Sequence, residues 1–301
     1  MCKLKIKPFV KWAGGKKQLL EKLEERMPKE YNRYYEPFIG GGALLLDVQP
    51  HIAVINDVNE QLLNVYSQLK ANAEAVISKI EEYDSYYCGD ALECSDTCHY
   101  ANARDCEEAR NCYKEYYLQM REKYNEKIKL QALDIECAAL MIWINKHCFN
   151  GLYRVNSKGL FNVPYNNKVN GNSMDKENLK NISQYLNENK VEIRKGDFEE
   201  ACKDVEPGDF VYFDSPYIPE STTANFTDYT KEGFNYDAHC RLARLFKQLD
   251  AKGIKVMLSN NDVELVHKLY EGFHIENVDA ARMINRDASK RKGKEVIITN
   301  Y

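Results

Sequence analysis

The residues Asp214–Tyr217 combine a carboxylate, a proline-braced turn and an aromatic side chain, directly after the apolar run Val211–Phe213. A carboxylate and a neighbouring backbone carbonyl, held by a rigid turn, can accept both protons of an exocyclic amine. The flat face of Tyr217 can stack on the base that carries this amine. The motif is therefore a candidate catalytic site for a nucleobase amine, with an ordinary Asp-Ser-Pro turn as the alternative.

Two further strand ends carry residues suited to a nucleotide-like ligand. Glycines 40–42 follow Phe38-Ile39, so the backbone can turn tightly and offer free N–H groups at the start of the next helix. They lack the full G-x-G-x-x-G spacing, so a dinucleotide site is not indicated. Asp57 follows the run Ile52–Ile55, and an acid there can bridge the two hydroxyls of a ribose. Together these features favour a ribose-bearing cofactor; a plain glycine turn and a surface aspartate are the alternatives.

The pattern around these motifs predicts an α/β fold. Residues 31–60 have the pattern of strand, glycine turn, helix and strand, and further apolar runs follow from residue 190 onward. A helix is predicted over Tyr236–Ala251, capped by Asn235 and stopped by Gly253. This alternation is typical of a doubly wound sheet, which binds ligands beyond the carboxyl ends of its strands. The later strand candidates are Val191–Arg194, Asp209–Phe213, Ile254–Ser259, His274–Val278 and Glu295–Tyr301.

A long interruption separates the two parts of this pattern. Residues 61–147 carry apolar side chains at helical spacing, including a stretch that starts with Leu130 and Leu133. Residues 148–175 are rich in Asn, Gly and aromatic residues, with turn signals at Asn150-Gly151 and Lys158-Gly159, and predict an exposed hairpin. We therefore expect residues 61–175 to be inserted into a single doubly wound domain formed by residues 1–60 and 176–301.

Composition and charge exclude several classes of protein. With 301 residues, 44% hydrophobic and 29% charged, the chain is not mainly disordered. It has neither an apolar run of about 20 residues nor a signal-like N-terminus, so we expect a cytoplasmic protein without membrane contact. The net charge of −4 argues against a purely electrostatic DNA binder. Basic residues nevertheless cluster in residues 1–30 and 281–294, which fits a solvated face or a polyanion partner.

Ten cysteines occur in the chain, and five of them lie within residues 88–112 together with His99. Zinc sites usually show tighter ligand pairs, whereas the spacing here is irregular and includes no C-x2-C pair. We expect reduced thiols on a helical insertion, and no metal.

Eight blocks of the chain, in family order, resemble the DNA adenine-N6 methyltransferases that include the Dam enzymes acting at GATC. The resemblance implies the Rossmann-like, doubly wound α/β fold of class I methyltransferases, with an inserted, mostly helical target-recognition domain that carries a β-hairpin. It also implies methyl transfer from S-adenosyl-L-methionine to N6 of adenine in double-stranded DNA. The blocks are Phe9–Lys16, Glu36–Gly42, Asn56-Asp57, Phe149–Arg154, Gly159–Pro164, Gly196–Phe198, Asp214–Tyr217 and Glu295–Tyr301.

The resemblance also implies residue roles. Arg154 suits a guanine edge, and Pro164 or Leu152 a thymine methyl group. The catalytic residues it implies are Asp214, Ser215, Pro216 and Tyr217. The cofactor contacts it implies are Trp12, Lys16, Glu36, Phe38, Gly40, Gly42, Asp57, Asp197, Phe198 and Asp214. The DNA contacts it implies are Lys11, Phe149, Asn150, Leu152, Arg154 and Pro164.

Two positions depart from the family pattern. The usual Asp-Pro-Pro-Tyr is Asp-Ser-Pro-Tyr here, so Ser215 is expected to act through its backbone carbonyl, at some loss of rigidity. The intercalating position, often Tyr, holds Phe149, which keeps the stacking face and loses only a hydroxyl. Neither substitution excludes activity.

The implied mechanism needs no covalent enzyme intermediate and no metal. Acceptors at Asp214 and the Ser215 carbonyl localise the lone pair of the amine, while the everted base stacks on Tyr217. A cytosine-N4 methyltransferase and a catalytically silent DNA-binding homologue are the alternatives. We expect a monomer without an obligate protein partner, in a bacterium or encoded by a phage.

Overall fold

The computed structural model describes residues 3–16, 18–88, 107–168, 172–218, 234–281 and 292–301. The chain divides into two compact units. The helical unit comprises Met1–Gly15, Gly40–Gly42 and Asn59–Glu188, and the sheet unit comprises Lys16–Ile39, Ala43–Val58 and Asn189–Tyr301. These bounds differ from the expected division, because residues 1–15 and 176–188 pack with the helices of the insertion. The function expected of each part stays a prediction.

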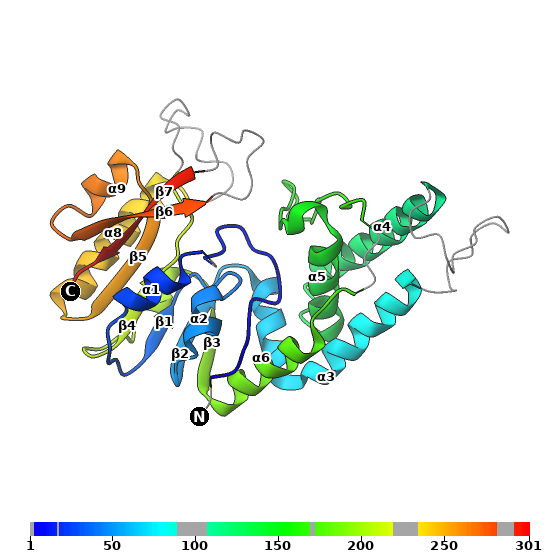
Figure 1. Cartoon of the computed structure of the whole chain (residues 1–301), viewed down its shortest axis with the longest axis horizontal. Coiled ribbons are helices and arrows are strands. Elements are labelled where there is room, and N and C mark those ends of the chain that lie inside the picture. Colours follow the sequence, from blue (N-terminus) through cyan, green and yellow to red (C-terminus); the bar gives the residue numbers. More distant parts are fainter. Residues whose placement is uncertain (1–2, 17, 89–106, 169–171, 219–233, 282–291) are drawn as a thin grey trace. The chain divides into compact units, whose positions relative to one another are not determined.

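The sheet unit contains a seven-stranded sheet in the order β3-β2-β1-β4-β5-β7-β6 (Figure 1). The strands from β3 to β5 are parallel, whereas β7 runs antiparallel to β5 and β6. The chain order reverses between β1 and β4, which is the point where doubly wound sheets bind ligands. The predicted α/β fold is therefore confirmed. The strands are β1 Tyr34–Glu36, β2 Ile52–Asp57, β3 Lys190–Lys195, β4 Phe210–Phe213, β5 Lys255–Asn261, β6 His274–Ala281 and β7 Lys292–Thr299.

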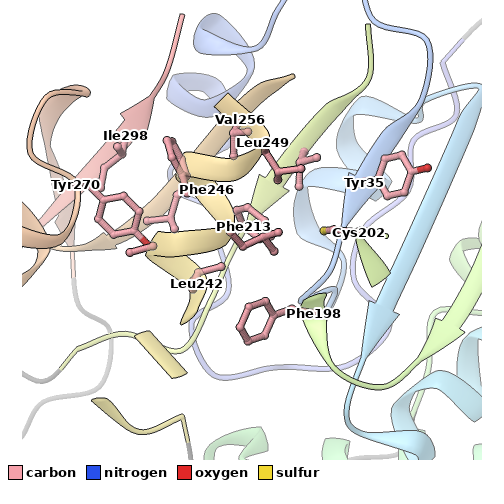
Figure 2. Packing of buried hydrophobic residues seen from close by; sticks show 14 of the residues in the cluster. Tyr35, Phe198, Cys202, Phe213, Leu242, Phe246, Leu249, Val256, Tyr270 and Ile298 are labelled. Carbon is pink, nitrogen blue, oxygen red and sulfur yellow. The ribbon is translucent and has the colours of Figure 1, made fainter. Parts of the chain in front are cut away.

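Apolar packing against the sheet fixes these elements. All four residues of β4 are buried, as expected for a central parallel strand covered on both faces. Helix α8 begins after Asn235, whose side chain accepts a hydrogen bond from the Ala238 backbone N–H. Its buried residues recur at helical spacing and pack on the sheet, where Figure 2 shows Leu242, Phe246 and Leu249 beside Val256 and Phe213. The helices of this unit are α1 Leu20–Arg26, α2 Ala43–Val48, α7 Phe198–Ala201, α8 Tyr236–Ala251 and α9 Glu264–Leu269.

The helical unit confirms the mostly helical character of the insertion. Helix α5 is buried along almost its whole length and packs against α3 and α4. The stretch that begins with Leu130 and Leu133 was predicted to be helical, but both residues lie in the connection before α5 and are 76% and 42% exposed. Asp134 ends that connection by capping α5 through the Cys137 backbone N–H. The helices are α3 Glu60–Cys88, interrupted at Asn72, α4 Glu107–Lys129, α5 Ile135–His147 and α6 Lys176–Glu188.

The segment that follows α5 forms a loose hairpin with one buried side. Two antiparallel bridges join Cys148 to Tyr165 and Val155 to Phe161. Phe161, Val163 and Tyr165 are buried, whereas Pro164 is exposed, which is the alternation of an extended strand on a core. The prediction of a wholly exposed hairpin was therefore wrong for this side. Among the helices that the structure describes, none combines the length and the apolar character needed to cross a bilayer.

Five of the described cysteines are buried or partly buried thiols, namely Cys112, Cys137, Cys148, Cys202 and Cys240. Burial raises the pKa of Cys137 to about 12 and that of Cys148 to about 11, so both stay protonated at neutral pH. Residues 89–106 of the cysteine-rich stretch and residues 282–291 of the basic C-terminal stretch lie outside the described residues.

Candidate active site

Carboxylates follow or end four neighbouring parallel strands of the sheet unit. Glu36 and Asp57 are the last residues of β1 and β2, Asp197 follows β3 within two residues, and Asp214 directly follows β4. The side chain of Asn56 ties three of these ends together, because its amide donates to the Pro37 carbonyl at 3.0 Å and to the Gly196 carbonyl at 2.9 Å. Four predicted site residues thus share the carboxyl edge of the sheet, beside the reversal between β1 and β4.

Asp214 pairs with a buried lysine. The Lys16 ammonium lies 2.6 Å from Asp214 Oδ1 and 4.2 Å from the centre of the Tyr217 ring. Ser259 on β5 donates a hydrogen bond to the same carboxylate at 3.3 Å. Burial raises the pKa of Asp214, while the charge and the hydrogen bond of Lys16 lower it. Lys16 thus opposes the effect of burial and favours the charged form of this carboxylate.

Tyr217 is held at its hydroxyl and through the backbone of the next residue. Its hydroxyl donates to Glu295 Oε2 at 2.6 Å. The Ile218 backbone donates to Asn260 Oδ1 and accepts from the Asn261 amide. Burial, followed by the charges of Asp214 and Glu295, raises the pKa of Tyr217 well above its usual range, so its hydroxyl remains a donor. No local motif in the sequence indicated Asn260 or Asn261, because both lie more than 40 residues from Ile218 along the chain.

Ser215 is buried beside this pair. Among the residues that the structure describes, its hydroxyl has no hydrogen-bond partner. The expectation that Ser215 acts through its backbone carbonyl stays a prediction.

Glu36 is buried and accepts a hydrogen bond of 2.7 Å from the Tyr34 hydroxyl. Burial raises the pKa of Glu36 to about 8, the Tyr34 bond opposes this shift, and the negative charge of Asp214 adds to it. Glu36 and Asp214 thus interact electrostatically within the sheet unit, and Glu36 carries a proton at neutral pH.

Glu36→Gln is expected to flatten the pH dependence of stability. The folded protein binds a proton at Glu36 that the unfolded chain releases near its ordinary pKa of 4.5, so the stabilisation is full below that value and is lost as pH rises toward 8. The loss reaches about 1.4 kcal/mol per pH unit for one proton. Urea unfolding of both proteins between pH 5 and 8.5 measures the difference. Parallel curves would contradict the assignment.

The other predicted cofactor residues of the sheet unit surround an aromatic cluster. Phe38 contacts Phe198 with ring centres 5.3 Å apart. Asp197 caps α7 through the Glu199 backbone N–H and pairs with Arg241 at 2.7 Å. The guanidinium of Arg241 also lies over the Phe198 ring at 5.0 Å. Sequence reasoning missed Arg241, since it lies on α8, 44 residues after Asp197.

Trp12, Gly40 and Gly42 belong to the helical unit, whereas the other predicted cofactor residues belong to the sheet unit. Trp12 stacks on Tyr153 with ring centres 5.1 Å apart. Gly40 has a φ of +46°, and a Cβ there would lie 2.8 Å from Trp12 Cδ1. The glycine turn is therefore required both by its backbone conformation and by the close approach of the indole.

The predicted DNA contacts lie on the outer side of the hairpin and on the nearby N-terminal segment of the same unit. Lys11, Phe149, Asn150, Arg154 and Pro164 are exposed, and Phe149 leaves half of its surface to solvent. Leu152, also predicted, is half-buried. The side chain of Arg154 donates from Nε to Asn162 Oδ1 at 2.7 Å, which orients its guanidinium across the hairpin.

Asn145, which sequence reasoning missed, joins these two segments. Its buried amide accepts from the Lys11 backbone N–H at 2.8 Å and donates to the Lys11 and Gly151 carbonyls, each at 3.0 Å. A Cβ on Gly151 would lie 2.8 Å from Lys11 Cβ. One side chain at the end of α5 thus fixes Lys11 beside the turn that carries Phe149 and Asn150.

A second polar cluster in the helical unit has the composition of a serine hydrolase site but not its order. Ser173 stands between His147 and Asp84, with the His147 ring nitrogen 2.7 Å from its hydroxyl. A nucleophilic serine would instead need the histidine between the other two residues. Asp84 also accepts from Trp143 at 2.9 Å, so the cluster ties residue 173 to α3 and α5.

Comparisons with known proteins identify the family of this chain. Residues 12–284 match the model of the D12 class N6 adenine-specific DNA methyltransferases. The chain is 44% identical over 300 residues to the Type II methyltransferase M1.LlaDCHI of Lactococcus lactis subsp. cremoris, covering 99% of this chain and 97% of that protein. It is 41% identical over 310 residues to the Type II methyltransferase M.MjaIII of Methanocaldococcus jannaschii, covering 99% and 100%. It is 27% identical over 300 residues to the DNA adenine methylase of Escherichia coli strain K12, covering 99% and 96%. The chain therefore belongs to the D12 class of N6 adenine-specific DNA methyltransferases.

Proposed function

We propose that this DNA methyltransferase uses S-adenosylmethionine as its methyl donor and modifies the adenine of GATC in double-stranded DNA. The observation that carries the proposal is the placement of Asp214, Lys16 and Tyr217 at the carboxyl end of β4, next to the reversal in strand order. A ligand site is expected there in a doubly wound sheet.

The chemistry of the strand ends suits this methyl donor. Asp57 ends β2, where a carboxylate can accept hydrogen bonds from both hydroxyls of a ribose. Asp197 and Phe198 follow β3. When bound, S-adenosylmethionine supplies an electrophilic methyl group on a sulfonium. Lys16, Phe38 and the residues of the glycine turn complete the proposed contacts.

Three groups of this chain act on the target amine. The Asp214 carboxylate and the Ser215 carbonyl each accept a hydrogen bond from one N–H of this amine. These hydrogen bonds draw the nitrogen toward a tetrahedral geometry and localise its lone pair. Tyr217 stacks on the everted base and offsets part of the few kcal/mol that unstacking costs. Asp214 also stabilises the positive charge that develops on N6.

The hairpin supplies the proposed DNA contacts. Phe149 presents an exposed aromatic face that can enter the base stack, and Arg154 presents a guanidinium suited to a guanine edge. Lys11, Asn150, Leu152 and Pro164 lie on the hairpin and on the segment that Asn145 ties to it. GATC is the site implied by the resemblance of Lys11, Leu152, Arg154 and Pro164 to the DNA contacts of the Dam enzymes.

Mapping methylated bases tests this proposal. The gene is expressed in a host without DNA methyltransferases, and modified positions are identified across the genome. The proposal expects N6-methyladenine at GATC. Methylation of adenine at another sequence would contradict the site, and N4-methylcytosine would contradict the target base.

Arg154→Ala is expected to relax specificity at one guanine of the site. Loss of a bidentate base contact costs about 1–3 kcal/mol of discrimination at that position. Methylation rates on duplexes with single substitutions measure the change, with Lys158→Ala on the same hairpin as a matched control for loss of a positive charge. A uniform loss of rate across all duplexes would show that Arg154 contacts phosphate instead.

A further inference from the structure

Glu295 lies on β7, where this strand meets the carboxyl end of β5. In the antiparallel register Glu295 stands opposite Asn261 of β5, and β5 in turn pairs with β4 through Phe213 and Leu258. Asp214, which follows Phe213, therefore shares one edge of the sheet with Glu295. The pairing of three strands thus brings Tyr217 and Glu295 together, although they lie 78 positions apart in the chain.

The contact between Glu295 and Tyr217 is a charge-assisted hydrogen bond. Glu295 Oε2 accepts from the Tyr217 hydroxyl at 2.6 Å, within the range of such bonds. Because burial raises the pKa of Tyr217 well above its usual range, the phenol is protonated at neutral pH and acts as the donor. The direction of the bond is thus fixed.

This hydrogen bond completes a set of restraints on the Tyr217 ring. Asn260 and Asn261 hold the backbone of the next residue, and the Lys16 ammonium lies 4.2 Å from the ring centre. These contacts hold the backbone next to Tyr217 and place the Lys16 ammonium over the ring. At the far end of the ring, the hydrogen bond to Glu295 restrains the position of the phenol oxygen.

We propose that Glu295 is a positioning residue for methyl transfer: its carboxylate holds the Tyr217 ring in the orientation that stacks on the target adenine. This inference rests on the proposed function, because it requires that Tyr217 receive the everted base. Orientation matters since a small misplacement of a reacting group lowers the rate steeply. Glu295 itself does not touch the base in this assignment.

Three variants of the full-length protein test the inference. Glu295→Ala removes the acceptor, Glu295→Gln keeps an acceptor oxygen without the charge, and Tyr217→Phe removes the donor. Each is measured by transfer of a labelled methyl group from S-adenosylmethionine to unmethylated plasmid DNA. Glu276→Ala is the matched control, because Glu276 lies on β6 of the same sheet and pairs with Arg26.

The expected result is a loss of about tenfold in kcat for Glu295→Ala, with KM for S-adenosylmethionine unchanged. Glu295→Gln is expected to restore most of this loss, and Glu276→Ala to leave kcat unchanged. Combining Glu295→Ala with Tyr217→Phe is expected to cost no more than either change alone. A wild-type kcat for Glu295→Ala, no rescue by Gln, or full multiplication of the two losses would each overturn the inference.

Tyr217→Ala separates this inference from the function on which it rests. If Tyr217→Ala keeps the wild-type kcat, the stacking role of Tyr217 fails and the inference about Glu295 fails with it, whereas the proposed function fails only if the wild-type protein transfers no methyl group from S-adenosylmethionine to DNA. If Tyr217→Ala loses activity while Glu295→Ala does not, only the positioning role of Glu295 is wrong.

Discussion

Asp214→Ala is expected to abolish measurable methyl transfer while DNA binding stays largely intact. Asp214 is the charged hydrogen-bond acceptor for the target amine. Removal of such an electrostatic group costs about a hundred- to a thousandfold in kcat. The loss is expected in kcat rather than in the affinity for DNA, because the proposed DNA contacts lie on the hairpin and the N-terminal segment. Methyl-transfer kinetics together with DNA-binding titrations measure both quantities.

A second variant distinguishes lost chemistry from lost folding. Asp214→Ala leaves the Lys16 charge buried without this partner, which destabilises the protein. Combining Lys16→Met with Asp214→Ala removes both charges, so the double variant is expected to regain stability and stay inactive. A double variant that is stable and transfers methyl groups would contradict the catalytic assignment of Asp214.

Lys16→Met is expected to have the second largest effect, through the carboxylate beside it. Burial already raises the pKa of Asp214, and Lys16 is the group that opposes this shift most strongly. Without Lys16 the pKa of Asp214 rises further, so the carboxylate becomes protonated at a higher pH. Activity that needs the charged form of Asp214 is therefore lost at a higher pH. The acid limb of the pH–rate profile moves to higher pH.

Stability is expected to change in the same variant. Breaking a buried ion pair costs about 3–5 kcal/mol, but Asp214 keeps 21% of its side chain exposed, so a loss of about 2 kcal/mol is expected. Lys16→Arg serves as the control that keeps the positive charge. The account predicts an upward shift of the acid limb for Met and a smaller one for Arg; an unmoved limb in Lys16→Met would contradict it.

Local patterns in the sequence were sufficient to predict the sheet. The parallel strands β2, β4 and β5 contain short, buried apolar runs, as expected where both faces of a strand are covered, and each predicted strand is found with its bounds shifted by only a few residues. Helix α8 was predicted with its cap at Asn235, since a cap and its helix are adjacent in the chain. The placement of Asp57 and Asp214 at strand ends followed from the same reasoning, whereas Glu36 was indicated only by the family resemblance.

Contacts between distant residues could not be predicted in this way. Asn145 and Lys11 are 134 positions apart, and Tyr217 and Glu295 are 78 apart. Nothing in the local pattern of either residue indicates its partner, because the pairing depends on how whole elements pack. Residues 1–15 joined the helical unit for the same reason, since an extended segment has no periodicity that reveals its neighbour.

Leu130 and Leu133 show that helical spacing of apolar residues alone does not establish a helix. Their spacing fits a helix, but the chain between α4 and α5 must turn there, and both side chains remain exposed. In the hairpin, the buried residues Phe161, Val163 and Tyr165 alternate with outward ones, and the polar composition of the segment hid this alternation.

The structure of a complex with a GATC duplex and an unreactive analogue of S-adenosylmethionine tests the central claim most directly. The account predicts an adenine turned out of the helix, with its N6 about 3 Å from both the Asp214 carboxylate and the Ser215 carbonyl, and with its ring stacked on Tyr217. An adenine that remains paired in the duplex, or an amine held by other groups of the protein, would contradict it.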